Sequence, residues 1–152
     1  MNFQQNRSKT VGHVRVVNLR GDGITIEADE TPIRVDRASR IFGNPFHIER
    51  RGDMAARMHV LMAYQNHLAK DLRERGPISK EIKVLAERLN NGENLALQCW
   101  CAPLPCHGDH LVRVIREESA RLQNSPGNDV SHAECDNAEH FGARSLKERE
   151  CT

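Results

Sequence analysis

The chain has 152 residues, of which 38% are hydrophobic and 28% are charged. This length suits one domain of ordinary size. Its 22 basic and 21 acidic residues nearly cancel, whereas binding to nucleic acid requires a concentrated basic face, so the charge does not indicate a nucleic-acid partner. No stretch approaches the ~20 apolar residues of a membrane span, and the first residues lack the apolar run of a signal peptide. We therefore expect a cytoplasmic protein that has no membrane partner, with its oligomeric state left open.

The predicted elements begin after a polar lead-in, residues 1–12. His13 to Leu19 is rich in β-branched residues, and the apolar side chains on both of its faces indicate a buried strand. Residues 24–28 and 33–35 are two short strand candidates on either side of a turn that begins at Glu30. We expect these two segments to form a hairpin at the edge of the sheet.

Three helices are predicted from apolar residues at helical spacing: 53–75, 78–90, and a third from 107 or 108 to about 123. Asp53 is the candidate N-cap of the first helix, and Gly76-Pro77 ends it. On that helix we interpret Met54, Met58 and Met62 as core residues rather than as a binding face. A short strand at 95–100 separates the second helix from the third.

This order of elements predicts an α/β fold, in which a small single domain over residues 13–123 has a short, mainly parallel sheet flanked by about three helices. The polar residues 124–152 lack the apolar periodicity of a packed element, so we expect a flexible C-terminal tail. Ligands of parallel sheets bind beyond the carboxyl ends of the strands, where the loops after Leu19 and Trp100 lie.

The most informative segment is Cys99–His107, because three of the five cysteines fall within its first eight residues. Clustered thiols in a reducing compartment more often indicate a metal site or catalysis than disulfides. Cys99 and Cys101 are two residues apart, so at the end of a strand their side chains point to the same side. Cys106 and His107 fall where the third helix begins, and the N-terminus of a helix lowers the pKa of a thiol.

Three interpretations of this segment stay open. In the first, the thiols of Cys99, Cys101 and Cys106 bind a metal together with His107, and zinc is the ion that thiolates and imidazole suit best. In the second, Cys106 is a catalytic nucleophile and His107 is its base or orienting group. In the third, the cysteines are small apolar residues that pack under the helix.

The metal interpretation leaves the fourth ligand open. The spacing C-x-C-x4-C-H differs from the usual C-x2-C knuckle, and neighbouring Cys106 and His107 would be strained if they shared one ion. His110, one helical turn beyond His107, and Cys135 in the tail are the other candidates for the fourth ligand.

A second informative segment contains Gly43-Asn44-Pro45-Phe46. Asn44 is pushed towards an extended conformation because it precedes proline. One interpretation is a rigid loop that presents the Asn44 amide and the cation Arg37 to a small anionic or nucleotide-like ligand. The other is a structural turn between strand and helix. Asn18, at the end of the first strand, has the same two interpretations, as a ligand-binding residue or as a residue that holds the loop.

Three blocks in this order carry a resemblance: Val16–Leu19, Arg37 with Gly43–Phe46, and Cys99–Asp109. Together they resemble a family of bacterial and phage proteins catalogued as domain of unknown function 4326, over roughly residues 14–118. The resemblance implies a compact α/β domain and no particular reaction. Where the family tends to have Ile-Gly-Arg, this chain has Val35-Asp36-Arg37, which keeps Arg37 in register and puts Asp36 in doubt as a functional position.

Two hypotheses follow. The first is a small enzyme or metal-binding domain that acts on a nucleotide-like or other anionic ligand, with Asn18, Asn44 and Cys99–His107 around a single pocket. The second is a non-catalytic phage or mobile-element protein that binds a host or defence component. A cleft that joins the two motif loops favours the first hypothesis, and a broad exposed apolar patch away from them favours the second.

Overall fold

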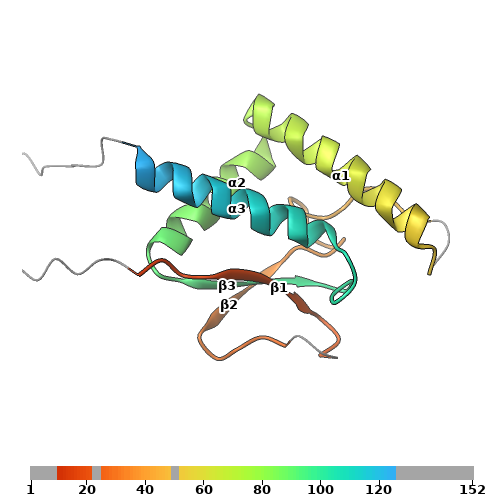
Figure 1. Cartoon of the computed structure of the whole chain (residues 1–152), viewed down its shortest axis with the longest axis horizontal. Coiled ribbons are helices and arrows are strands. Elements are labelled where there is room, and N and C mark those ends of the chain that lie inside the picture. Colours follow the sequence, from red (N-terminus) through yellow and green to blue (C-terminus); the bar gives the residue numbers. More distant parts are fainter. Residues whose placement is uncertain (1–9, 22–24, 49–51, 126–152) are drawn as a thin grey trace, which may run out of the picture.

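A computed structural model describes residues 10–21, 25–48 and 52–125 of the chain. The elements within these residues are β1 (Val14–Asn18), β2 (Glu30–Arg34), α1 (Met54–Glu74), α2 (Pro77–Asn90), β3 (Asn94–Cys99) and α3 (His107–Asn124). The helices lie on one side of the sheet (Figure 1). The predicted α/β class is therefore confirmed, whereas the predicted tail and most of the lead-in lie outside the described residues. The expected domain limits stay a prediction.

The sheet is parallel throughout, with the strand order β1-β3-β2. β3 is the central strand, and Leu95, Ala96 and Leu97 within it have no exposed surface. The register sets Asn18 opposite Cys99 on one side of β3 and Arg34 opposite Gln98 on the other. Because all strands run in the same direction, their carboxyl ends meet at one edge, which is where parallel sheets place their ligands.

The predicted hairpin is wrong. Residues 25–28 form no strand, and Glu30-Thr31-Pro32, expected as a turn, is the first part of β2, which pairs in parallel with β3. Ile24 lies outside the described residues. Pro32 has no N–H to donate, and it is tolerated because β2 is an edge strand. We attribute the pairing of β2 with β3 to the contact between Glu30 and Arg15 of β1. A local turn pattern in the sequence does not indicate such a contact.

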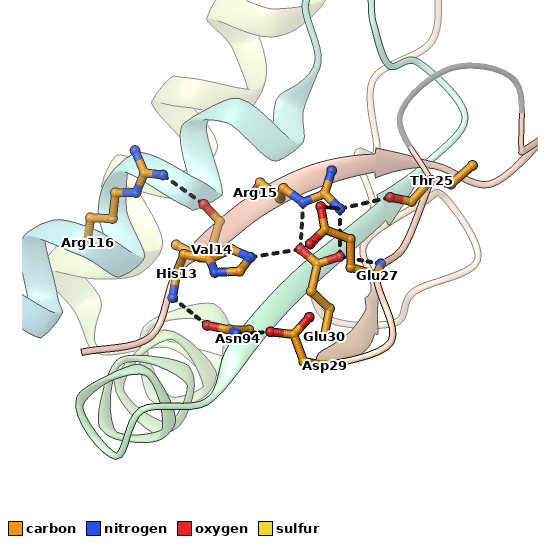
Figure 2. Close-up of polar contacts among 9 residues, drawn as sticks. All are labelled: His13, Val14, Arg15, Thr25, Glu27, Asp29, Glu30, Asn94 and Arg116. Atoms are coloured by element: carbon orange, nitrogen blue, oxygen red, sulfur yellow. Dashed lines mark hydrogen bonds and ion pairs between the residues drawn. The ribbon is translucent and has the colours of Figure 1, made fainter. Parts of the chain in front are cut away.

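Glu30 belongs to an ion-pair network on the face of the sheet opposite the helices (Figure 2). Its side chain has no exposed surface, and Oε1 accepts from Nε of Arg15 at 2.5 Å and lies 3.0 Å from Nε2 of His13. Oε2 accepts from Nη2 of Arg15 and from the Glu27 backbone N–H, each at 2.7 Å. Arg15 is in register with Ala96 of β3, whose small side chain lets the ion pair cross the central strand. The network thus joins β1 to β2, which are not neighbours in the sheet.

The helix ends follow the local signals of the sequence. The Asp53 side chain accepts the Ala56 N–H at the start of α1, and Arg75 ends that helix in a left-handed conformation with φ 52°. α2 begins at Pro77. Proline suits the first turn of a helix because an N–H at that position would have no acceptor within the helix, so its absence costs no hydrogen bond. Cys106 is the N-cap of α3. The core between helices and sheet consists mainly of Leu, Ile and Val from every element.

The methionines of α1 are not core residues, contrary to our interpretation of the sequence. Met54, Met58 and Met62 are 50%, 46% and 59% exposed. α1 packs mainly against α2 and α3, so only a narrow face of this helix is covered, and it buries just Leu61, Tyr64 and Leu68.

Candidate functional site

Three cysteines meet where β3 ends and α3 begins. The sulfur atoms of Cys99, Cys101 and Cys106 all lie within 4.8 Å of one another, so they form a group that could hold a metal ion. Cys99 is the last residue of β3, and it is 2% exposed, as is Cys106. Cys101 lies in the connecting loop and is partly exposed. The parallel sheet and the helix N-terminus therefore bring together thiols that the chain spaces irregularly.

Cys106 caps α3 by a reciprocal pair of hydrogen bonds. Its sulfur accepts from the Gly108 N–H at 3.3 Å, and its own backbone N–H donates to the Asp109 carboxylate at 2.8 Å. The unpaired N–H groups and the dipole of a helix N-terminus stabilise negative charge on such a sulfur. The local sequence thus fixes the position of one thiol of the group.

His107 is held beside this group in a defined tautomer. Nε2 lies 2.6 Å from the Val35 carbonyl oxygen, and since a carbonyl only accepts, Nε2 carries the proton and Nδ1 carries a lone pair. Nδ1 lies 3.6 Å from the Cys106 sulfur and 3.9 Å from the Cys99 sulfur. Burial lowers the pKa of His107, which favours this neutral ring. The ligand atoms of Cys106 and His107 are therefore close together, and whether the two residues would be strained in sharing one ion stays a prediction.

Two of the spacings among these atoms match those of a tetrahedral zinc site. Zinc–sulfur and zinc–nitrogen bonds of about 2.3 and 2.0 Å place ligand atoms roughly 3.6 to 3.8 Å apart. The distances from His107 Nδ1 to two of the sulfurs, 3.6 and 3.9 Å, are of this size. The group within 4.8 Å holds the three sulfurs alone, without His107 or His110, so Nδ1 of His107 lies close to the sulfurs of Cys106 and Cys99 but outside that group. Cys135 lies outside the described residues.

The thiols also influence one another's protonation. The pKa of Cys101 is lowered, first by hydrogen bonds from Cys106 and Cys99 and then by the hydrogen bond and the positive charge of Arg57. The pKa values of Cys99 and Cys106 are raised, chiefly by their hydrogen bonding with Cys101. The negative charge therefore gathers on Cys101, the most accessible of the three sulfurs.

A cavity of about 380 Å³ lies beside the thiols. Its walls include Arg37 and Asn44 from the loop after β2, Arg57 from α1, and Cys99, Cys101 and His107. Five of the predicted site residues thus line a single pocket, although they come from segments far apart in the sequence.

Two other predicted site residues lie outside the lining of this pocket. Cys106 is buried behind it. Asn18 holds the cysteine loop, because its side-chain nitrogen donates to the Ala102 carbonyl while its oxygen accepts the Arg20 N–H. Of the two interpretations of Asn18, the structure shows the one in which it positions a loop.

Arg37 and Asn44 also stabilise the loop to which they belong. The Asn44 side-chain oxygen accepts the Phe46 N–H at 2.9 Å, and Nη2 of Arg37 donates to the Phe46 carbonyl at 2.7 Å. A second nitrogen of Arg37, Nη1, lies 2.5 Å from Nδ1 of His47. These hydrogen bonds hold the loop in its conformation at the point where it meets the pocket.

Among the polar and aromatic residues that line the pocket, sequence reasoning did not name three as site residues: Asp36, Arg57 and Trp100. Asp36 is 4% exposed, and a hydrogen bond from Arg34 lowers its pKa. Nη1 of Arg57 donates to the Pro105 carbonyl at 3.2 Å and so ties α1 to the cysteine loop. The position of Trp100 between two cysteines in the sequence was a usable signal. The departure from the family pattern put Asp36 in doubt, and no sequence signal pointed to Arg57.

The fold and the site define a small parallel α/β domain with a cluster of thiols at the carboxyl edge of its sheet. The chain belongs to the family described as Domain of unknown function (DUF4326), whose model matches residues 17–117. This span includes every residue named above as lining the pocket. No curated protein and no solved structure matches the chain. In the described part of the chain, every helix is too short or too polar to cross a membrane.

Proposed function

We propose that the protein binds a zinc ion through Cys99, Cys101, Cys106 and His107, and that this metal centre forms one wall of a binding site for a small anionic, nucleotide-like ligand. The observation that carries the proposal is the group of three sulfurs beside the pocket, together with the Nδ1 atom of His107, which lies 3.6 and 3.9 Å from two of them.

The donor set suits zinc for two reasons. Thiolates with one imidazole are the usual ligands of tetrahedral zinc, and four protein ligands close its coordination sphere. The Val35 carbonyl accepts the other ring proton of His107, which is the outer-shell contact that zinc-binding histidines typically make. A zinc ion bound here would fix the end of β3 to the start of α3, and therefore the shape of the pocket.

The remaining walls of the pocket suit an anion. Arg37 and Arg57 line it from two different elements, and guanidinium groups bind phosphate and carboxylate through paired N–H donors. Asn44 lines the same cavity. These cations outnumber the Asp36 carboxylate, which Arg34 already pairs at 2.7 Å. A zinc ion with three thiolates adds one net negative charge, so the two arginines still leave the local balance positive, where the chain as a whole is almost neutral.

The catalytic interpretation, with Cys106 as nucleophile and His107 as base, has one supporting observation, the 3.6 Å contact between their Sγ and Nδ1 atoms. Against it, Cys106 is 2% exposed and is not a lining residue. A substrate in the pocket would meet the Cys101 sulfur first. We therefore favour metal binding.

The non-catalytic hypothesis is favoured by a separate feature, the exposed methionines Met54, Met58 and Met62 on α1. Methionine side chains adapt to varied partners, which makes such a surface suitable for binding a host or defence protein. If this candidate is right, a Met58→Glu, Met62→Glu variant loses a partner that cross-links to α1 of the wild type and keeps its thermal stability. The pocket that joins the two motif loops makes ligand binding the better supported function.

Elemental analysis of untagged protein tests the metal centre. We expect one equivalent of zinc in the wild type, and its loss in Cys99→Ser, Cys101→Ser and Cys106→Ser, because serine lacks the soft thiolate. Cys135→Ser and Cys151→Ser are matched controls that keep the zinc. The metal centre would be ruled out if the reduced wild type takes up no zinc when it is incubated with the ion and all three serine variants are folded.

A further inference from the structure

Trp100 is the single tryptophan of the chain and lies between Cys99 and Cys101 in the sequence. Its side chain lines the pocket. Although it is a large aromatic residue, it is 50% exposed. Its Nε1–H donates to Oδ2 of Asp36 at 3.1 Å, and the Arg20 guanidinium lies 5.9 Å from its ring centroid. The indole is therefore held in one orientation while much of its surface stays accessible, which is the arrangement of a stacking surface rather than of a core residue.

Asp36 gives this arrangement its rigidity. The carboxylate is 4% exposed and is fixed by Arg34 through bonds of 2.7 and 3.2 Å. A buried carboxylate that holds an exposed indole is costly for stability alone, because it requires desolvation of a charge. The pair acts as a support for the aromatic ring, with Asp36 as its positioning residue.

The same pocket contains cations in addition to the ring. Arg57 has five N–H donors, of which one bonds the Pro105 carbonyl and another the Cys101 side chain. Donors are thus left for an anionic group of a ligand, and Arg37 adds a second positive charge. An aromatic surface and two arginines in one pocket are the combination that binds a base and a phosphate together.

The size of the cavity limits the ligand. Its volume of about 380 Å³ is near the lower end of the range of small-molecule pockets, roughly 300 to 1,000 Å³. One base, one sugar and one phosphate suit this space better than a dinucleotide. We infer that the ligand is a nucleoside monophosphate whose base stacks on Trp100 and whose phosphate binds Arg37 and Arg57. This inference rests on the proposed anion site and adds the planar ring to it.

The experiment compares ligands that have the ring with a ligand that lacks it. Zinc-loaded full-length protein is titrated with the four common ribonucleoside 5′-monophosphates, with ribose 5-phosphate and with inorganic phosphate, by calorimetry and by the fluorescence of Trp100. We expect at least one nucleotide to quench the fluorescence and to bind about tenfold more tightly than ribose 5-phosphate, the usual contribution of one stacked base.

Variants separate stacking from phosphate binding. Trp100→Leu lowers nucleotide affinity about tenfold and leaves ribose 5-phosphate affinity unchanged, whereas Trp100→Phe keeps part of the difference. Asp36→Asn retains an acceptor for the indole N–H and restores most of the nucleotide affinity that Asp36→Ala loses. Leu104→Ala, an equally exposed apolar residue of the same loop, is the matched control and changes neither affinity.

Each result decides between the two proposals. If ribose 5-phosphate binds as tightly as every nucleotide, the base does not stack on Trp100 and only the anion site stands. The same conclusion follows if Trp100→Leu weakens the binding of the nucleotides and of ribose 5-phosphate alike. If no phosphate-bearing probe binds the zinc-loaded wild type, the proposed anion site is wrong as well.

Discussion

Replacing Glu30 by glutamine is the sharpest test of how the sheet is held together. The substitution keeps the shape of the side chain but exchanges one acceptor oxygen for an NH2 donor. Every partner of Glu30 is a donor or a positively charged group: Arg15 twice, His13, and the Glu27 backbone N–H. The new NH2 group would therefore face another donor in a site with no exposed side-chain surface.

The magnitude follows from the pKa of this carboxyl group. Hydrogen bonds from Arg15 lower the pKa of Glu30 from 4.5 to about 2. At 1.36 kcal/mol per pKa unit this shift corresponds to roughly 3 kcal/mol. Arg15 is 28% exposed, so solvent screening brings the expected loss to about 2–3 kcal/mol. Because the pKa is depressed in the folded state, the stabilisation is complete above about pH 5 and is lost as the pH falls towards about 2.

Chemical unfolding of wild type and Glu30→Gln at several pH values measures this effect. We expect a difference in unfolding free energy of about 2–3 kcal/mol at pH 7 that shrinks by about half at pH 3. Leu104→Ala, an exposed residue away from the network, is the control and loses almost nothing. A difference under 0.5 kcal/mol at pH 7, or one that does not change with pH, would refute this account of the network.

Three further predictions concern the site and the tail. Cys106→Ser is expected to lose the zinc without losing the helix, because serine still caps α3, so circular dichroism shows an intact helix while elemental analysis shows no zinc. His107→Ala leaves three thiolates and weakens zinc binding, so that a chelator removes the ion at a lower concentration than from the wild type; equal resistance would exclude His107 as a ligand. Truncation after Gln123 keeps the bond from its side chain to Asn90 and leaves a folded domain with nearly unchanged melting temperature; a large drop would show that the tail packs.

Much of the site was predictable because its signals are local or follow from strand direction. The helix start at Cys106 depends on bonds between residues that are at most three positions apart, so the sequence shows it directly. The meeting of Arg37 and Asn44 with the cysteines followed from a general property of parallel sheets, whose strand ends share one edge. His107 was a named candidate because it follows Cys106 at the start of the third helix, although its tautomer depends on Val35, which is 72 residues away in the chain.

By itself, the sequence determined the α/β class, the bounds of the three helices and the segment that carries the thiols, because capping and helical periodicity act over a few residues. Only the tertiary structure decided that β2 begins at Glu30, since the pairing depends on Arg15 reaching across β3. It also decided that Asp36, Arg57 and Trp100 join the pocket, and that the methionines of α1 stay exposed. These outcomes depend on which surfaces meet after the strands have paired, and no local pattern encodes that choice.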